Sequence, residues 1–127
     1  MKKAISVKGG RGTKGPYSQA IAYNDLIFVS GQGPVHLETG EIIYSDIKEE
    51  TTLTLENIKA ILEASGSSLD NVLKANVFLA NMDDFEEMNE VYKEYFKEPR
   101  PARTTIQAAR LPSSIKVEID VIAHITR

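Results

Sequence analysis

The residues best suited to bind an anion stand in the stretch KEPRPARTTIQAARLP, residues 97–112. Two prolines, Pro99 and Pro101, precede Arg103. Proline fixes its own φ and restricts the residue before it to extended geometry, so the approach to Arg103 has few conformations to lose. A guanidinium on such a restricted backbone could hold an anion in one orientation. An ordinary loop-to-strand turn would have the same local sequence.

Glu118 is the second residue that could do chemistry, because it is a carboxylate within a segment of high strand propensity. It could form a salt bridge with Lys116, Arg103 or Arg110. It could instead act as an acid or base, or orient a water, near an arginine anchor. Composition and spacing leave both interpretations open.

Other kinds of site find little support in the sequence. There is no cysteine, and His36 and His124 lack the spacing of metal ligands, so a metal site is not expected. The glycine-rich segment 9–15 is interpreted as a flexible turn, because Lys14 is not followed by the Ser or Thr of a phosphate loop. No GxSxG nucleophile motif occurs, which argues against a serine hydrolase.

Length and charge indicate one globular domain over residues 1–127. The formal net charge of −3 disfavours a surface that binds nucleic acid by bulk electrostatics. The N-terminal segment has no apolar run of signal-peptide length, and no stretch is long enough to span a membrane. We therefore expect a cytoplasmic protein without a membrane partner.

Hydrophobic periodicity predicts the elements that must position Arg103 and Glu118. Alternating or dense apolar patterns predict strands over residues 4–9, 17–23, 26–32, 69–82, 103–111 and 116–125, the second and third joined by a turn at Asn24-Asp25. Two helices are expected, over 45–66 and about 84–96. The first should bury one stripe, formed by Ile47, Thr51, Leu55, Ile58 and Leu62.

The ends of the two helices are also marked in the sequence. Ser45 or Asp46 can cap the start of the first, and Gly66 is suited to end it in left-handed geometry. In the second helix, Pro99 follows the expected end, and four residues are expected to face inward: Phe85, Met88, Tyr92 and Tyr95.

This order of elements predicts an α+β fold in which two helices cover one face of a mixed sheet. The other face should carry Phe28, Phe78 and Ile122, and too little chain remains to cover them. An uncovered apolar sheet face usually marks an interface, so we expect a homo-oligomer.

Several motifs, in order along nearly the whole chain, resemble the reactive-intermediate deaminases, the Rid (RidA/YjgF-type) family. They begin with KGPYSQA (14–20), the Ser-Gly-Gln turn of VSGQGP (29–34) and TGEI (39–42). They continue with NIKAILEASGSSLDNVLKANVFLANMDDF (57–85), NEVYKEYF (89–96), RPARTT (100–105) and RLPSSIKVEIDVIA (110–123).

The resemblance implies a chorismate-mutase-like fold, a homotrimer, and active sites in clefts between subunits. It implies hydrolysis of 2-iminopropanoate, 2-iminobutanoate or their enamine tautomers to 2-oxo acids and ammonium. These imines arise when pyridoxal-phosphate dehydratases act on serine or threonine. No metal or organic cofactor is implied.

The resemblance also assigns roles to residues of this chain. Arg103 matches the arginine that binds the substrate carboxylate, and Glu118 the glutamate that orients or deprotonates the attacking water. Tyr17 matches a residue that assists proton transfer or holds water. Ser30 and Asn89 match pocket residues, and backbone groups around Gly31 and Thr105 supply further hydrogen bonds. Thr105 replaces the cysteine of some members, and the 97–102 loop is shorter than in some.

Two alternatives stay open. The chain could bind small carboxylates through Arg103 without catalysis. It could also act on RNA, as an inhibitor of translation or a ribonuclease, although the acidic charge and the lack of a basic stripe or paired histidines argue against this.

Overall fold

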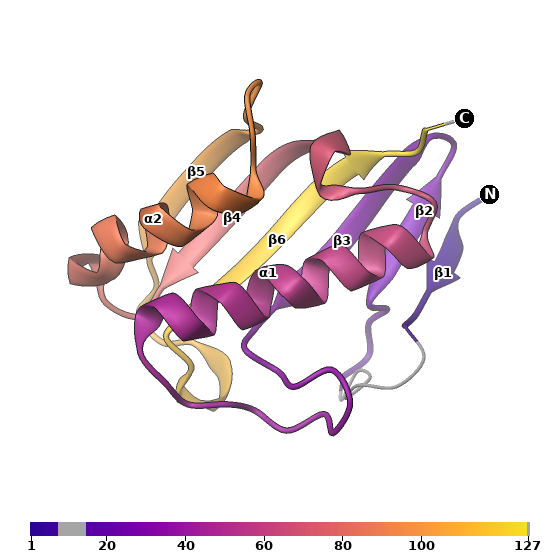
Figure 1. Ribbon diagram of the computed structural model, residues 1–127. Helices are drawn as coiled ribbons and strands as arrows, with labels where there is room; N and C mark the ends of the chain where they lie inside the picture. Colours follow the sequence, from indigo (N-terminus) through magenta and orange to yellow (C-terminus); the bar gives the residue numbers. More distant parts are fainter. Residues whose placement is uncertain (8–14, 127) are drawn as a thin grey trace.

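The computed structural model describes residues 1–7 and 15–126, and shows one six-stranded sheet with two helices on the same face (Figure 1). The predicted glycine-rich turn lies, apart from Gly15, outside the described residues. The strands are β1 (Lys3–Ile5), β2 (Ala20–Tyr23), β3 (Leu26–Gln32), β4 (Val72–Leu79), β5 (Ala102–Gln107) and β6 (Val117–His124). No helix in the described part of the chain is long and apolar enough to cross a membrane.

The strand order is β1-β2-β3-β6-β4-β5, which places the last strand at the centre and β5 at one edge. Among the strands of the described residues, only β4 and β5 pair in parallel, because helix α2 (Phe85–Tyr95) connects them; the other neighbours are antiparallel. The sheet is therefore mixed, as the sequence predicted.

Several predicted strands are shorter in the structure. The first ends at Ile5, and Tyr17 lies before β2 rather than within it. Residues 69–71 and 82–84 form 3-10 turns on either side of β4, and β5 stops at Gln107. Each trimmed segment lies where the chain leaves the sheet and loses ladder hydrogen bonds, a boundary that side-chain pattern marks poorly.

The first predicted helix is confirmed as α1 (Ile47–Ala64). Asp46 caps it by accepting a hydrogen bond from the Glu49 N–H at 2.8 Å, and Gly66 follows its end with a φ of +80°. All five residues of the predicted stripe are buried, as are Met88 and Tyr92 of α2.

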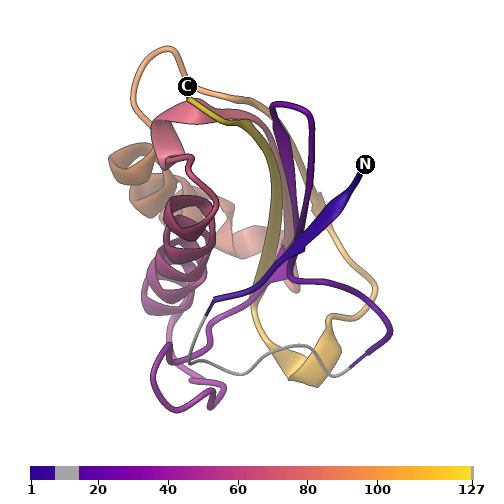
Figure 2. The same cartoon turned by 90° about the vertical axis from the view of Figure 1, so that its right-hand side faces the viewer.

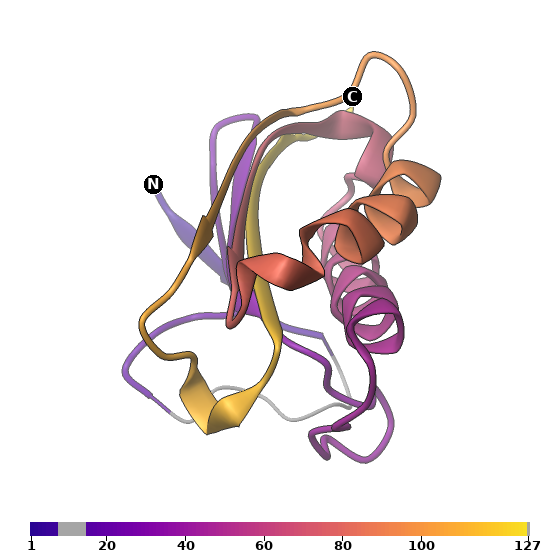
Figure 3. The same cartoon turned by 90° about the vertical axis from the view of Figure 1, so that its left-hand side faces the viewer.

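Strand register divides the sheet into two faces. The face under the helices carries the buried core, to which β6 contributes Val117, Ile119, Val121 and Ala123. The opposite face, here called the open face, bears Phe28, Phe78, Ile106 and Ile122. Phe28 of β3 pairs with Ile122 of β6, and Phe78 of β4 pairs with Ile106 of β5. Figures 2 and 3 show the sheet edge-on with both helices on one side. The predicted direction of Phe28, Phe78 and Ile122 is confirmed.

Candidate functional site

Arg103 projects from edge strand β5 towards α2. It pairs in register with buried Ala75, so its side chain lies on the helix face of the sheet. Its Nη1 donates a hydrogen bond to Asn89 Oδ1 at 2.7 Å. Its guanidinium carbon lies 4.7 Å from the ring centre of Tyr92 and 5.5 Å from that of Phe85. Helix α2 therefore holds the guanidinium by one hydrogen bond and two aromatic faces.

Thr105 lies two residues further along β5 on the same face, paired with buried Val77. Its hydroxyl oxygen is buried and has no hydrogen-bond partner among the described residues. Buried polar atoms normally find a partner, so this hydroxyl beside the arginine is a group that a bound water or ligand could satisfy.

Glu118 lies on the open face, where it is paired with Phe78 of β4. It is half-buried, and this burial raises the pKa of its carboxyl group, with a smaller contribution from the like charge of Asp120. A carboxylate that is costly to ionise is a better proton acceptor than an ordinary one once it is ionised. The position suits acid–base chemistry.

Gly31 makes room for that carboxylate. A Cβ built on Gly31 would lie 2.5 Å from Glu118 Oε2, so any side chain there would displace it. The register between β3 and β6 shifts between Val29 and Gln32, which makes this segment a β-bulge within a strand. The strand predicted over residues 26–32 is confirmed as β3, and its Ser-Gly-Gln motif lies in the bulge, where the Gly31 backbone lies against Glu118.

Ser30 ties the segment before β2 to this bulge. Its N–H donates to the Gln19 carbonyl at 2.9 Å, and its hydroxyl donates to the Ser18 carbonyl at 2.7 Å. Tyr17 immediately precedes this anchored segment and is 56% exposed. The chain around it loops out on the side of the sheet away from the helices (Figures 2 and 3).

The predicted site residues thus form two groups rather than one. Arg103, Asn89 and Thr105 lie together on the helix side of β5. Glu118 and Gly31 lie together on the open face, and Ser30 joins Tyr17's segment to them. Register places Glu118 of β6 level with Ile106 of β5, not with Arg103. Because β4 lies between β6 and β5, the two backbones are two strand spacings apart, about 10 Å. Within the described part of one chain, the sheet separates the two groups.

Comparison with known proteins shows the family of this chain. The family model described as Endoribonuclease L-PSP, the YjgF/RutC family, matches residues 11–125. A RutC family protein from Pyrococcus horikoshii is 49% identical over 98% of each chain. The chain belongs to the YjgF/RutC family.

Two further relatives of the YjgF/RutC family bear on the site. Escherichia coli TdcF, named a "putative reactive intermediate deaminase", is 43% identical over 97% of each chain. A crystal structure of TdcF with bound serine superimposes with a TM-score of 0.90 at 41% identity, covering 98% of this chain and 99% of that one. RidA from an Antarctic Psychrobacter superimposes with a TM-score of 0.91 at 39% identity, covering 97% and 99%.

Sequence reasoning missed two residues of this YjgF/RutC site. Phe85 and Tyr92 were assigned only to the core, yet both rings contact the Arg103 guanidinium. The available signal was their spacing with Asn89 at i, i+4 and i+7, which places three residues on one helix face.

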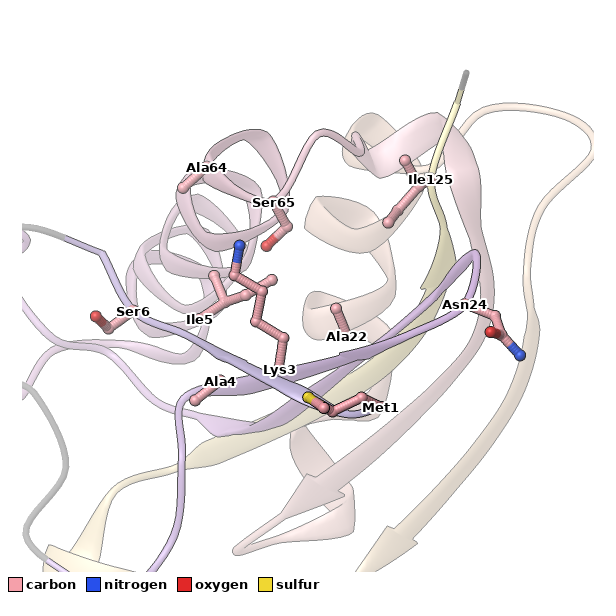
Figure 4. Close-up of a pocket in the computed structure, with 10 residues that line it drawn as sticks. All are labelled: Met1, Lys3, Ala4, Ile5, Ser6, Ala22, Asn24, Ala64, Ser65 and Ile125. Atoms are coloured by element: carbon pink, nitrogen blue, oxygen red, sulfur yellow. The ribbon is translucent and has the colours of Figure 1, made fainter.

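The cavity shown in Figure 4 is a different part of the molecule. Its volume is about 530 Å³, and it lies between β1, the end of α1 and Ile125. None of the predicted site residues lines it. The described residues also contain no group of three or more His, Cys, Asp or Glu side chains that could hold a metal.

Proposed function

We propose that the protein hydrolyses reactive 2-imino acids and their enamine tautomers, such as 2-iminopropanoate and 2-iminobutanoate, to 2-oxo acids and ammonium. Pyridoxal-phosphate dehydratases that act on serine or threonine would supply these substrates. The observation that carries the proposal is Arg103: α2 holds its guanidinium, and it forms no ion pair with a carboxylate among residues 1–7 and 15–126.

A guanidinium of this kind suits a small organic acid. It presents five N–H donors in a planar fork, and Asn89 accepts from Nη1. The remaining donors can grip a substrate carboxylate through two parallel hydrogen bonds, which fixes its rotation as well as its position. The serine bound in TdcF is a molecule of this size with an α-carboxylate, which supports the assignment.

Glu118 supplies the second half of the proposed reaction. Ionised, it accepts a proton from a water that attacks the protonated imine carbon and forms a carbinolamine. Glu118 then returns this proton to the nitrogen, and the hydroxyl group loses its proton as the carbonyl forms. The C–N bond breaks, nitrogen takes the bonding electrons, and ammonia leaves and is protonated to ammonium. Tyr17 would hold the water or relay a proton, and the Gly31 and Thr105 backbones would bind the substrate. Positioning suffices because imine hydrolysis is already fast in water.

The two groups of residues can meet only if copies of the chain assemble, so a homotrimer is part of the proposal. The open face carries exposed apolar side chains that no element of the described chain covers, with Phe28 41% and Ile106 47% exposed. A neighbouring copy packed on this face would bury it and carry its own β5 edge close to Glu118. Each site would then combine Arg103 of one copy with Glu118 of the next.

The test is the lifetime of the imine. A threonine dehydratase generates 2-iminobutanoate, semicarbazide traps the remaining imine, and the semicarbazone is followed by absorbance. The wild-type protein should shorten the lifetime, whereas Arg103→Ala should return it to the uncatalysed value because two charge-assisted hydrogen bonds are lost. Lys59→Ala removes an exposed cation on α1 and should behave as wild type.

Two results would contradict the proposal. If the wild-type protein leaves the lifetime unchanged while binding 2-oxobutanoate through Arg103, the chain is a carboxylate-binding protein without this activity. If it binds generic RNA tightly, with affinity that falls steeply as salt rises, an RNA-directed function replaces it.

A further inference from the structure

Three residues of α2 form a single contact surface for Arg103. Phe85, Asn89 and Tyr92 follow one another at i, i+4 and i+7, so they lie on one face of the helix, and that face meets β5. Asn89 accepts a hydrogen bond in the plane of the guanidinium, whereas Phe85 and Tyr92 contact it through their rings. The guanidinium is thus held from several directions by one rigid element.

An aromatic ring holds a guanidinium differently from a carboxylate. A carboxylate would accept the N–H donors of the fork and neutralise its charge. A ring attracts the cation through its quadrupole and accepts no hydrogen bond in the plane of the fork. The two rings therefore orient Arg103 while leaving most of its donors and its full charge for a ligand.

The hydroxyl group of Tyr92 does not explain why a tyrosine stands at this position. Tyr92 is only 4% exposed, and its hydroxyl has no hydrogen-bond partner among the described residues. Burial raises the pKa of this hydroxyl, so it stays neutral. The ring itself is placed by packing, with its centre 4.5 Å from that of Phe96. What Tyr92 contributes to Arg103 is its ring.

We propose that Phe85 and Tyr92 are positioning residues, an aromatic clamp that fixes the orientation of the Arg103 guanidinium for binding a carboxylate. The inference rests on the proposed function for its ligand, but the clamp itself is a property of the free protein. Strand β5 supplies Arg103, and on this proposal helix α2 sets the orientation of its guanidinium.

The first test measures the dissociation constant of 2-oxobutanoate by calorimetry. Tyr92→Leu and Phe85→Leu should each weaken binding about five- to tenfold, because a ring contact with a partly desolvated cation is lost. Tyr92→Phe keeps the ring and should stay within about twofold of wild type. Tyr95→Leu is the matched control: it removes another ring of α2, one whose hydroxyl contacts Glu56 rather than Arg103, and should leave the affinity unchanged. In the deaminase assay, the leucine variants should raise KM more than they lower kcat.

The second test needs no ligand. In NMR spectra of the free protein, the Arg103 side-chain protons should be shifted upfield by the two rings. The shift should shrink in Tyr92→Leu and Phe85→Leu, and persist in Tyr92→Phe and Tyr95→Leu. If the shift is present but 2-oxobutanoate does not bind, the clamp stands and the proposed function fails.

Two outcomes would overturn the clamp. One is an Arg103 signal in the wild-type protein that is free of ring-current shift, whatever the binding data show. The other is equal loss of affinity in Tyr92→Phe and Tyr92→Leu, because the hydroxyl and not the ring would then carry the effect.

Discussion

Arg103 and Glu118 project from opposite faces of the same sheet, Arg103 towards α2 and Glu118 towards the open face. The paired strands β5, β4 and β6 lie between them, so a change of rotamer does not bring the two side chains together within a chain. A reaction that uses both must therefore take place between copies.

This relationship predicts that two inactive variants will restore each other. Arg103→Ala and Glu118→Gln should each fail in the imine assay, but a mixture that has exchanged subunits should regain activity. In a cyclic trimer, every mixed assembly holds one site with both residues intact, so random exchange at equal amounts should restore about one quarter of wild-type activity. Activity that stays absent after verified exchange would show that both residues act in one chain.

The open face predicts how assembly can be prevented. Phe28→Asp places a charge among the exposed apolar side chains of the open face. It should dissociate the oligomer into monomers, because burying that charge is unfavourable. Sedimentation velocity measures the result. Leu37→Asp is a matched control, since Leu37 is 38% exposed against 41% for Phe28 but lies outside the sheet. If both variants keep the wild-type sedimentation coefficient, the open face is not the interface.

The helices show how much of this fold the sequence could predict. The five-residue stripe of α1, its Asp46 cap and Gly66 are local features, and each lies where the pattern placed it. The strand β6 alternates so regularly that the two faces of the sheet could be assigned from it alone.

The two sides of the candidate site could not be predicted in the same way. The side on which Arg103 points depends on its pairing with Ala75, a register between distant segments. Strand β5 lies at the sheet edge and has polar residues on both faces, so the alternation of its side chains does not indicate which face Arg103 is on. Tyr92 was missed because an apolar residue at helical spacing is normally a core residue, which Tyr92 also is.

Gly31→Ala should impair activity more than stability. The new Cβ would lie 2.5 Å from Glu118 Oε2, the far end of a flexible side chain, so the carboxylate should move while the backbone stays. A displacement of about 1 Å can cost on the order of a hundredfold in rate. The imine assay and thermal unfolding together measure both effects.

Gly33→Ala gives the opposite result and serves as the control. Its Cβ would lie 2.9 Å from Ile115 Cδ1, a buried side chain away from the carboxylate. Gly33→Ala should lower the melting temperature. Below that temperature, the folded variant should shorten the imine lifetime about as much as the wild type does. Loss of stability without loss of activity in Gly31→Ala would contradict the role assigned to Gly31.

A buried carboxylate fixes the start of β6. Glu50 is completely buried, and its two oxygens accept hydrogen bonds from the N–H groups of Lys116 at 2.8 Å and Ser45 at 3.1 Å. Glu50→Ala leaves both donors without their partner and should lower the free energy of unfolding by about 2–4 kcal/mol. Glu49→Ala, at the exposed neighbouring position, should stay within about 0.5 kcal/mol. Urea unfolding measures both, and equal stabilities would contradict the assignment.

The raised pKa of Glu118 predicts how stability depends on pH. Between the pKa of this group in the unfolded chain, about 4.3, and its higher value in the folded protein, the folded state binds more protons. The contribution of Glu118 to the unfolding free energy therefore falls as pH rises through this window and is a constant cost above it. Glu118→Gln cannot ionise, so it avoids that cost.

In the dissociated chain, where no neighbouring copy brings Arg103 near this carboxylate, Glu118→Gln should consequently be more stable than wild type at pH 7, and the difference should vanish below about pH 4. Thermal unfolding from pH 3.5 to 8 measures it, with Glu63→Gln, an exposed glutamate of α1, reporting the general effect of removing one charge. A Glu118→Gln variant that is less stable at pH 7, or a difference that does not change with pH, would mean that burial does not penalise this carboxylate. Glu118 would then be an ordinary surface group rather than a primed base.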